Sequence, residues 1–403
     1  MFSGYLKRVF MKVSGQSDRV VIIGSGMAGY FLVQAIREQS KDVPVVLLTE
    51  NDGRFYPKPM LSSALYHRKS PADIVTATAD DMATKYQVDI RTFACVEMID
   101  SAAKKIFYRQ GDNKEVLEYA HVVLATGSDP KTLPLAGSGV SECYQINTLE
   151  AYESWTSNLN TGDNIAIIGS GLVGVEFAHD LTHAGYNVQV VSQFEQALYG
   201  LVPDNIGLKV RHHLQSLGVD WMVDRCLQRI EKVKDGLLLC GSDGREILVD
   251  KVLMAVGIAP RTDLKAEGLI IDDRGGYKVD VYAKTANASI YAIGDCACVC
   301  GLQMTYVAPI KQQVKALAQT LTGVLTPIVY PAMPVVVKTP TMPLTMVPVR
   351  GDYQGRWHDV SEQDDQAVSA FYDDDQHLRG FVLQGTATVK RSEWLEKMPM
   401  LMG

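Results

Sequence analysis

Glycines recur at the spacing G-x-G-x-x-G in two places along this chain. They are Gly24, Gly26, Gly29, Gly169, Gly171 and Gly174. In such a motif the first glycine permits a tight turn, the second lets a pyrophosphate approach the backbone, and the third lets a helix pack closely on a strand. The N-terminus of that helix stabilises the negative charge of the phosphates. Each copy therefore predicts a site for one dinucleotide.

Both motifs lie between a buried strand and a helix, which is the context that they require. The apolar runs 19–24 and 164–169 precede them, and continuous apolar runs of this kind are typical of parallel strands buried on both faces. Helical apolar spacing follows each motif, and a further strand, at 43–49 and 187–191, completes each βαβ unit. The chain thus contains two copies of one nucleotide-binding unit.

The second strand of such a unit is expected to end in an acid that accepts hydrogen bonds from the adenosine ribose. Glu50 takes this position in the first unit. In the second unit the expected position is Ser192 and the nearest acid is Glu195, so the way in which this ribose is held stays open. Segment 192–203 contains no Lys or Arg to pair with a 2′-phosphate, which favours NADH over NADPH.

Length and composition indicate a globular protein of two or three domains. The 403 residues include 39 Lys+Arg and 46 Asp+Glu, and the resulting charge of −7 disfavours binding to nucleic acid or to an anionic membrane. Apolar runs are too short to cross a bilayer. Seven scattered cysteines without a C-x-x-C pair are typical of a reducing compartment, so we expect a cytoplasmic protein without structural disulfides. The basic residues 1–18 are interpreted as a leader, with Met11 as an alternative initiator.

Three further motifs follow in a fixed order, and the whole set resembles the two-dinucleotide flavoprotein reductases. They are Ala125-Thr126-Gly127, Ala255-x-Gly257-x-x-Pro260 and Tyr291-Ala-Ile-Gly294-Asp295. The resemblance implies an α/β fold with two Rossmann-like domains, of which the first binds FAD and the inserted second binds the nicotinamide coenzyme. A small α+β domain follows, because short alternating runs succeed the prolines at 327–334. The expected domains are 19–128 with 254–326 for FAD, 129–253 for NAD, and 327–403 at the C-terminus.

The same resemblance implies which residues contact the cofactors, with Asp295 bonding the ribityl chain of FAD. On the FAD side the expected residues are Gly24, Gly26, Met27, Ala28, Gly29, Glu50, Lys58, Pro59, Ala125, Thr126, Gly127, Gly257, Gly294, Asp295, Val307 and Lys338. On the NAD side they are Gly169, Gly171, Gly174, Glu176 and Glu195. Lys58 is the candidate for a cation beside the flavin, and its alternative is a solvated surface lysine between two prolines.

Two features of the chain narrow the range of possible electron acceptors. No cysteine lies between Gly24 and Asp81, which excludes a dithiol mechanism, so electrons must leave the flavin directly. The stretch Met333–Pro340 has no tryptophan and resembles the rubredoxin reductases, as does Tyr306–Pro309. This resemblance implies an FAD-dependent oxidoreductase that passes electrons from NADH through FAD, one at a time, to rubredoxin. It also places Glu176 and Lys338 near the nicotinamide and flavin, where we expect them to pair until NADH binds; the alternative is that they never meet.

Other functions stay open at this stage. The same chemistry can serve another small carrier, a flavorubredoxin or a ferredoxin, and the protein can instead be an NADH-responsive flavoprotein that acts by partner association. An oxygen-reducing oxidase is disfavoured by the missing active-site cysteine. The cluster Cys296-Ala-Cys298-Val-Cys300 lacks a fourth ligand and is interpreted as small buried residues rather than a metal site. Lys311, Lys315 and Arg54 are candidates for docking an acidic carrier.

Overall fold

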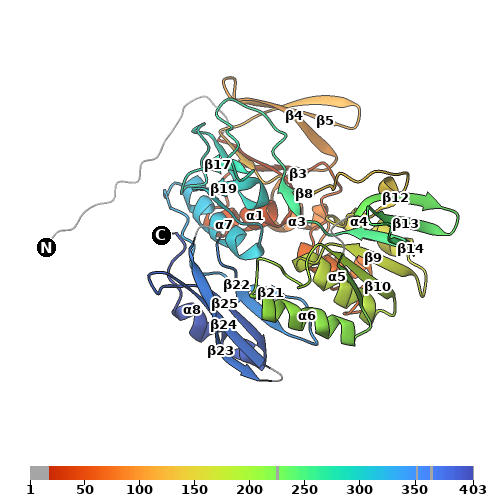
Figure 1. Ribbon diagram of the computed structural model, residues 1–403. Helices are drawn as coiled ribbons and strands as arrows, with labels where there is room; N and C mark the ends of the chain where they lie inside the picture. The colour runs from red at the N-terminus through yellow and green to blue at the C-terminus, as the bar shows by residue number, and fades with distance from the viewer. Residues whose placement is uncertain (1–17, 224–226, 351–352, 364–365, 403) are drawn as a thin grey trace.

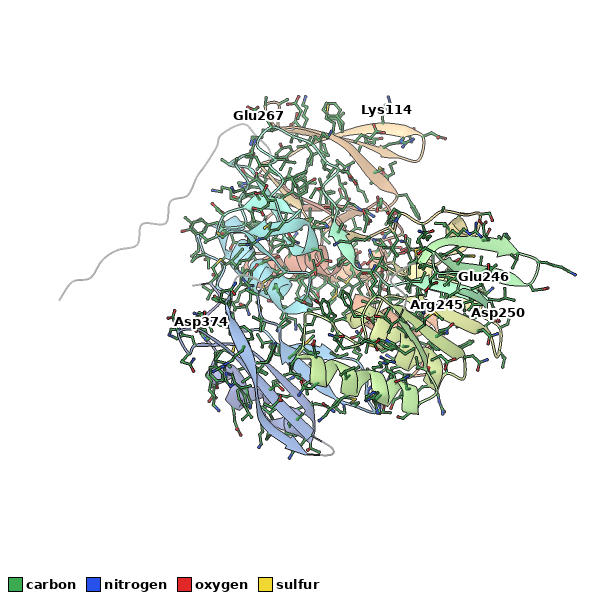
Figure 2. The ribbon with its side chains drawn as sticks, in the orientation of Figure 1. Lys114, Arg245, Glu246, Asp250, Glu267 and Asp374 are labelled. Atoms are coloured by element: carbon green, nitrogen blue, oxygen red, sulfur yellow. The ribbon has the colours of Figure 1, made fainter. Side chains whose placement is uncertain are left out.

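The computed structural model describes residues 18–223, 227–350, 353–363 and 366–402 (Figure 1). The predicted leader, apart from residue 18, lies outside the described residues. Within the described part, no helix has both the length and the apolar character needed to cross a bilayer. Figure 2 shows Lys114 and Asp374 at the rim of the molecule, and both side chains are exposed.

The first nucleotide-binding unit is built on a five-stranded parallel sheet with the order β18-β7-β1-β2-β3. Strand β1 is central and its four residues are buried, as expected for a strand covered on both faces. Helices α1 and α7 pack against each other beside this sheet (Figure 1). The elements are β1 (Val20–Ile23), α1 (Met27–Gln39), β2 (Val45–Leu48), β3 (Asp89–Arg91), β7 (His121–Leu124), β18 (Ile290–Ala292) and α7 (Val307–Leu321).

The second unit repeats this plan in a four-stranded parallel sheet with the order β11-β10-β9-β15. A three-stranded antiparallel sheet, β12-β13-β14, leads back into β15. The elements are α4 (Leu149–Ser157), β9 (Asn164–Ile168), α5 (Leu172–His183), β10 (Asn187–Ser192), α6 (Asp204–Ser216), β11 (Asp220–Val223), β12 (Leu227–Val233), β13 (Gly236–Gly241), β14 (Glu246–Val249) and β15 (Lys251–Met254). The two Rossmann-like units that the glycine motifs predict are therefore confirmed.

The chain leaves the first sheet after β7 and returns to it at β18. Two short strands pair with each other where the chain crosses between the two units. Strand β8 (Ser128–Pro130) runs antiparallel to β16 (Ile258–Pro260) at the crossing point. Strand β18 belongs to the first sheet although it follows the whole second unit in the sequence. The boundaries that we assign to the two domains stay a prediction, and this pairing supports them.

The C-terminal region forms a five-stranded antiparallel sheet with the order β21-β22-β25-β24-β23 (Figure 1). The short helix α8 lies against this sheet, with its Trp394 ring 5.8 Å from that of Phe381. The small α+β domain is thus confirmed. The elements are β21 (Val335–Val337), β22 (Leu344–Val347), β23 (Gly355–Gln363), β24 (Gln366–Asp373), β25 (Leu378–Gly385), η4 (Thr386–Lys390) and α8 (Arg391–Glu396).

The remaining elements decorate the first unit and its connection to the second. Two three-stranded sheets, β4-β5-β6 and β17-β19-β20, flank the five-stranded sheet. The elements are η1 (Lys58–Ser62), α2 (Pro71–Ile74), α3 (Ala79–Tyr86), β4 (Ala94–Asp100), β5 (Lys105–Gln110), β6 (Asn113–Glu118), η2 (Val140–Glu142), β17 (Tyr277–Val279), η3 (Gly294–Cys296), β19 (Ala297–Val299) and β20 (Leu302–Gln303).

Candidate active site

The first glycine motif has one open position between two crowded ones. A Cβ atom at Gly24 would lie 2.2 Å from the carbonyl oxygen of Ala125, and one at Gly29 would lie 2.0 Å from the carbonyl oxygen of Gly24. The close packing of the chain therefore requires glycine at both ends of the motif. At Gly26, directly before Met27 opens α1, a Cβ would meet no atom within 4 Å. This open backbone fits a pyrophosphate lying against the middle glycine.

The second motif repeats this geometry. A Cβ at Gly169 would lie 2.5 Å from the carbonyl oxygen of Ala255, one at Gly174 would lie 2.1 Å from that of Gly169, and one at Gly171 would meet nothing within 4 Å. Helices α1 and α5 both begin after the middle glycine without a side-chain cap and without an acid in the first turn. Their first N–H groups therefore face an open space, as an anion site requires. The protein has two matching cradles for dinucleotides.

The Gly294-Asp295 pair lies against the first cradle. A Cβ at Gly294 would lie 2.9 Å from the Cβ of Ala28 in α1. The Oε1 atom of Gln313, on α7, accepts a hydrogen bond from the Gly294 N–H at 2.6 Å. Ser128 Oγ donates to Asp295 Oδ2 at 2.8 Å. These contacts hold the Asp295 carboxylate beside the first motif, where the ribityl chain of FAD is expected.

Lys58 opens the short helix η1, and its ammonium group interacts with the nearby carboxylates of Asp295 and Asp129. Burial lowers the pKa of Lys58, and attraction to Asp295 opposes this shift. Within the described part of the chain, Lys58 makes no ion pair and its Nζ atom donates no hydrogen bond. Lys58 is partly buried, so it is not a fully solvated surface lysine, and its position beside the flavin stays a prediction. Pro59 follows it in the same turn, and Val307 opens α7, which has no side-chain cap.

Glu176 and Lys338 meet at the contact between the second unit and the C-terminal domain. Lys338 Nζ forms an ion pair with Glu176 Oε2, and the Lys338 N–H donates to Glu176 Oε1 at 3.0 Å. Ser62 Oγ, at the end of η1, donates to Glu176 Oε2 at 2.6 Å. The Glu176 side chain is only 5% exposed, and these three donors replace the water that its carboxylate loses on burial. Segments from three parts of the chain therefore converge on one buried carboxylate.

The acid of the first unit, Glu50, is exposed and forms an ion pair with Arg261. Arg261 directly follows β16 and also pairs with Asp129 at 2.5 Å. Thr126 Oγ1 donates to the Arg261 carbonyl oxygen at 2.8 Å, which joins this arginine to the Ala-Thr-Gly turn. Gly257, the glycine of the later motif, lies between β15 and β16 with a φ of +100°. Glu50 is thus tied to the crossing point between the two units.

The sheet register shows which residues correspond at the ends of β2 and β10. Thr49, directly before Glu50, shares a hydrogen bond of 2.7 Å with the serine of the first motif. Ser192 shares an equal hydrogen bond of 2.7 Å with Ser170 of the second motif. Ser192 is therefore the counterpart of Thr49, and Gln193 is the counterpart of Glu50. The positions expected for the two ribose-binding residues, Glu50 and Ser192, are therefore not equivalent in the two sheets, and which residue holds each ribose stays a prediction.

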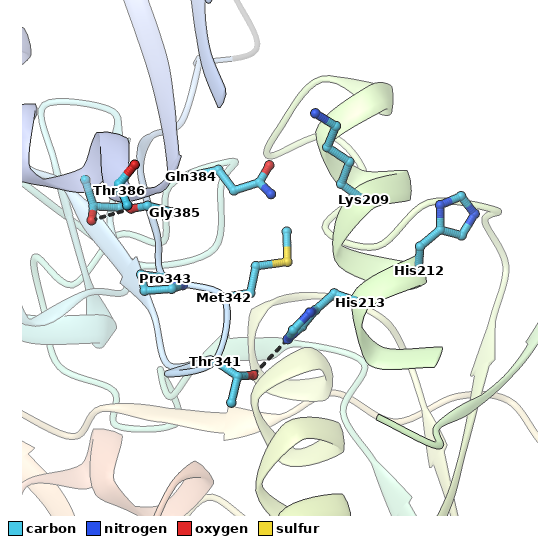
Figure 3. Close-up of a pocket in the computed structure, with 10 residues that line it drawn as sticks. Lys209, His212, His213, Thr341, Met342, Pro343, Gln384, Gly385 and Thr386 are labelled. Atoms are coloured by element: carbon cyan, nitrogen blue, oxygen red, sulfur yellow. Dashed lines mark hydrogen bonds between the residues drawn. The ribbon is translucent and has the colours of Figure 1, made fainter. Parts of the chain in front are cut away.

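A second contact between the domains lies one turn further along α5. His179 Nε2 and His213 Nε2 both lie 2.8 Å from Thr341 Oγ1. Burial, and after it the neighbouring His183 and His213, lowers the pKa of His179 to about 4. A groove of about 660 Å³ opens beside this contact, between α6 and the C-terminal domain (Figure 3). Figure 3 shows the hydrogen bond between His213 and Thr341 at one end of the groove.

Sequence reasoning missed several residues that hold the site together. Ser62, Ser128 and Gln313 each bond a predicted site residue or its neighbour. Asp180, on α5 after Glu176, accepts from the Tyr66 N–H at 2.6 Å, and burial raises its pKa to about 6. Ser128 directly follows the Ala125-Thr126-Gly127 motif, so a search for polar residues that flank the motifs would find part of this set.

The cysteine cluster and the candidate docking cations differ in exposure and in their contacts. Cys296 and Cys298 are buried, as expected, whereas Cys300 is exposed. Arg54 forms ion pairs with Asp52 and Glu153, so its charge is already engaged. Lys311 and Lys315 are exposed on α7.

Comparison with known proteins places these features in a family. Residues 18–320 match the family described as pyridine nucleotide-disulphide oxidoreductase, and residues 327–398 match the rubredoxin binding C-terminal domain. A rubredoxin-NAD(+) reductase of Acinetobacter baylyi is 35% identical over 94% of this chain and 97% of its own length. A nitric oxide reductase FlRd-NAD(+) reductase of Aliivibrio fischeri is 34% identical over 90% of this chain and 94% of its own length. The crystal structure of a covalent putidaredoxin reductase-putidaredoxin complex has the same fold, with a TM-score of 0.85 and 22% identity over 94% of this chain and 93% of that chain.

Proposed function

Because the chain belongs to the pyridine nucleotide-disulphide oxidoreductase family, and within it to the rubredoxin-NAD(+) reductases, we propose that it passes electrons from NADH through FAD to rubredoxin. One NADH supplies two electrons and two rubredoxins each accept one, so the products are NAD⁺, one proton and two reduced rubredoxins. The observation that carries this function is the meeting of η1, the helix α5 of the second cradle and the C-terminal domain at one buried carboxylate, Glu176.

Bound FAD supplies the step that the side chains cannot, because it accepts a hydride and releases electrons singly. In our proposal the first motif and the Ala125–Gly127 turn would hold its pyrophosphate, Asp295 would bond its ribityl chain, and Lys58 would supply a positive charge to its ring. The backbone at Gly171 and the first turn of α5 hold the pyrophosphate of NADH. Both assignments are supported by the open middle glycines and uncapped helices.

Glu176 and Lys338 act at the place where the two cofactors approach each other. The ion pair occupies the space beside η1 in the absence of NADH. When NADH binds, Lys338 leaves Glu176 and its ammonium group follows the coenzyme, while Ser62 keeps the carboxylate hydrogen-bonded. This proposal is supported by the partial exposure of Lys338, 28%, beside a carboxylate that is almost fully buried.

The carrier docks on the groove beside Lys338. This groove, of about 530 Å³, is lined by His67, Lys338, Val389 and Arg391, among other residues. Val389 is 84% exposed, although it is apolar, and Arg391 adds positive charge. A small acidic protein such as rubredoxin matches an apolar patch with a basic rim. Replacing Val389 by Asp tests the surface, because it adds a like charge for the carrier at an exposed site that leaves the core intact.

A flavorubredoxin is the second candidate carrier. It is favoured by the relatives named nitric oxide reductase FlRd-NAD(+) reductase, which match this chain at 32 to 34% identity. We also propose a cytoplasmic location, which is supported by the free thiols of the six described cysteines.

The proposed function is tested by mixing NADH-reduced holoenzyme anaerobically with rubredoxin, flavorubredoxin or ferredoxin. The acceptor that is reduced fastest identifies the carrier, and failure to reduce any carrier contradicts the proposal.

A further inference from the structure

The second nucleotide cradle lacks an acid at the position of Glu50, because the register places Gln193 there. A neutral amide does not repel a phosphate, so this position alone gives no reason for the protein to reject NADPH. A charged group elsewhere near the end of β10 can supply the discrimination instead. In segment 193–203 the only charged residue is Glu195.

Glu195 is held in place by an arginine from the next helix. Arg211, on α6, forms an ion pair with Glu195 Oε2, and its Nη1 atom also donates to the Glu195 carbonyl oxygen at 3.1 Å. The guanidinium lies 5.8 Å from the ring centre of Trp221, and Arg211 Nε has no hydrogen-bond partner among the described residues. The Arg211 side chain is 19% exposed, whereas that of Glu195 is 61% exposed. The exposed Glu195 carboxylate therefore covers the Arg211 guanidinium, which is largely buried.

The loop that carries Glu195 is fixed by its aromatic neighbours. The rings of Phe194 and Tyr199 stack with centroids 3.7 Å apart and an interplanar angle of 8°. Ser192 Oγ accepts from the Phe194 N–H at 3.0 Å, which ties the start of the loop to β10. Glu195 thus has a defined place at the carboxyl end of the strand where a dinucleotide carries its adenosine ribose.

We propose that the Glu195-Arg211 pair sets the coenzyme specificity of the protein by covering a 2′-phosphate site. The Glu195 carboxylate repels a 2′-phosphate and also occupies the guanidinium that would bind it. Without Glu195, Arg211 is a forked donor at the ribose, which is the chemistry that binds a phosphate monoester. This inference rests on the proposed function, since it concerns the coenzyme of the same reaction.

The test measures binding of two nucleotide fragments to the oxidised holoenzyme by calorimetry. The probes are 5′-ADP, which mimics the adenosine half of NADH, and 2′,5′-ADP, which carries the additional phosphate of NADPH. We expect Glu195→Gln to tighten 2′,5′-ADP at least tenfold and to change 5′-ADP less than about threefold. The double variant Glu195→Gln/Arg211→Gln should lose this gain. The ratio of kcat/KM for NADPH to that for NADH should move in the same direction.

Glu142→Gln is the matched control, because Glu142 forms an exposed ion pair with Lys232 in the same domain. It should leave both fragment affinities unchanged. Unchanged 2′,5′-ADP binding in Glu195→Gln, or a gain that persists without Arg211, would overturn the inference. Failure of the wild-type protein to bind 5′-ADP at all would instead overturn the proposed function together with this inference, so the two failures are distinguishable.

Discussion

Replacing Lys338 by Met removes the cation from the buried Glu176 carboxylate and keeps most of the side-chain volume. Breaking a buried ion pair by deleting one partner costs about 3–5 kcal/mol when the remaining charge has no other partner. Here Ser62 Oγ at 2.6 Å and the backbone N–H of residue 338 at 3.0 Å still donate to Glu176. We therefore expect Lys338→Met to lower the free energy of unfolding by about 2 kcal/mol, a smaller loss than that for an unpartnered charge.

The same substitution tests the role of Lys338 in the reaction. If the ammonium group follows NADH into the site, its loss removes one charged hydrogen bond of about 1.5–3 kcal/mol, which is roughly a 10- to 150-fold slower reduction of FAD by NADH. The measurement is the loss of flavin absorbance in an anaerobic stopped-flow experiment. Lys338→Arg keeps the charge and should recover part of the rate.

Lys232→Met is the matched control, since it breaks an ion pair whose partners are 60% and 47% exposed. Loss of an exposed pair should change the free energy of unfolding by less than about 1 kcal/mol and leave the rate of FAD reduction unchanged. Reduction of FAD at the wild-type rate in Lys338→Met would remove this lysine from the mechanism. An unchanged free energy of unfolding would refute the assignment of a buried pair.

Three further predictions concern the cradle, the histidine contact and the carrier. Gly171→Val should keep the melting temperature within about 2 °C, since the site is open, yet it should weaken NADH binding more than tenfold. Gly174→Ala should instead unfold the second unit, because the new Cβ would meet a carbonyl oxygen at 2.1 Å. The lowered pKa of His179 means that the unfolded chain binds a proton that the folded chain does not between pH 6.5 and about 4, so stability falls as pH falls. In urea unfolding, the free energy of unfolding of His179→Gln should rise relative to that of the wild type by up to about 1.4 kcal/mol for each pH unit that the pH falls within this window. A difference between the two proteins that stays constant with pH contradicts the assignment. Val389→Asp should slow reduction of rubredoxin at least fivefold without changing reduction of FAD by NADH; equal rates of carrier reduction would show that the carrier docks elsewhere.

The parts of the fold that local sequence determines were predictable. Each glycine motif combines a strand, a turn and a helix within about 20 residues, so residues that are close together in the sequence determine its geometry. The crowding at Gly24 and Gly29 shows why, since both glycines are required by backbone contacts of the motif itself and of the strand beside it. The alternating runs of the C-terminal region predicted the small α+β domain in the same way.

The contacts that assemble the site join residues far apart in the sequence, and periodicity does not encode them. Glu176 and Lys338 are 162 residues apart, and only the resemblance placed them together. Ser128 bonds Asp295 across 167 residues, and no pattern around either residue points to the other. The correspondence between the ends of β2 and β10 was not predictable for a different reason: the boundary of a strand is uncertain by a residue or two in sequence, and the sheet register fixes it.

The most direct test of the account is the electron stoichiometry of the purified holoenzyme under anaerobic conditions. One equivalent of NADH should bleach the flavin band, and the reduced protein should then be reoxidised by two equivalents of oxidised rubredoxin. Two rubredoxins reduced per NADH is the result that a two-electron donor and a one-electron acceptor require. A protein that binds no flavin, or a flavin that NADH leaves oxidised, would contradict the account.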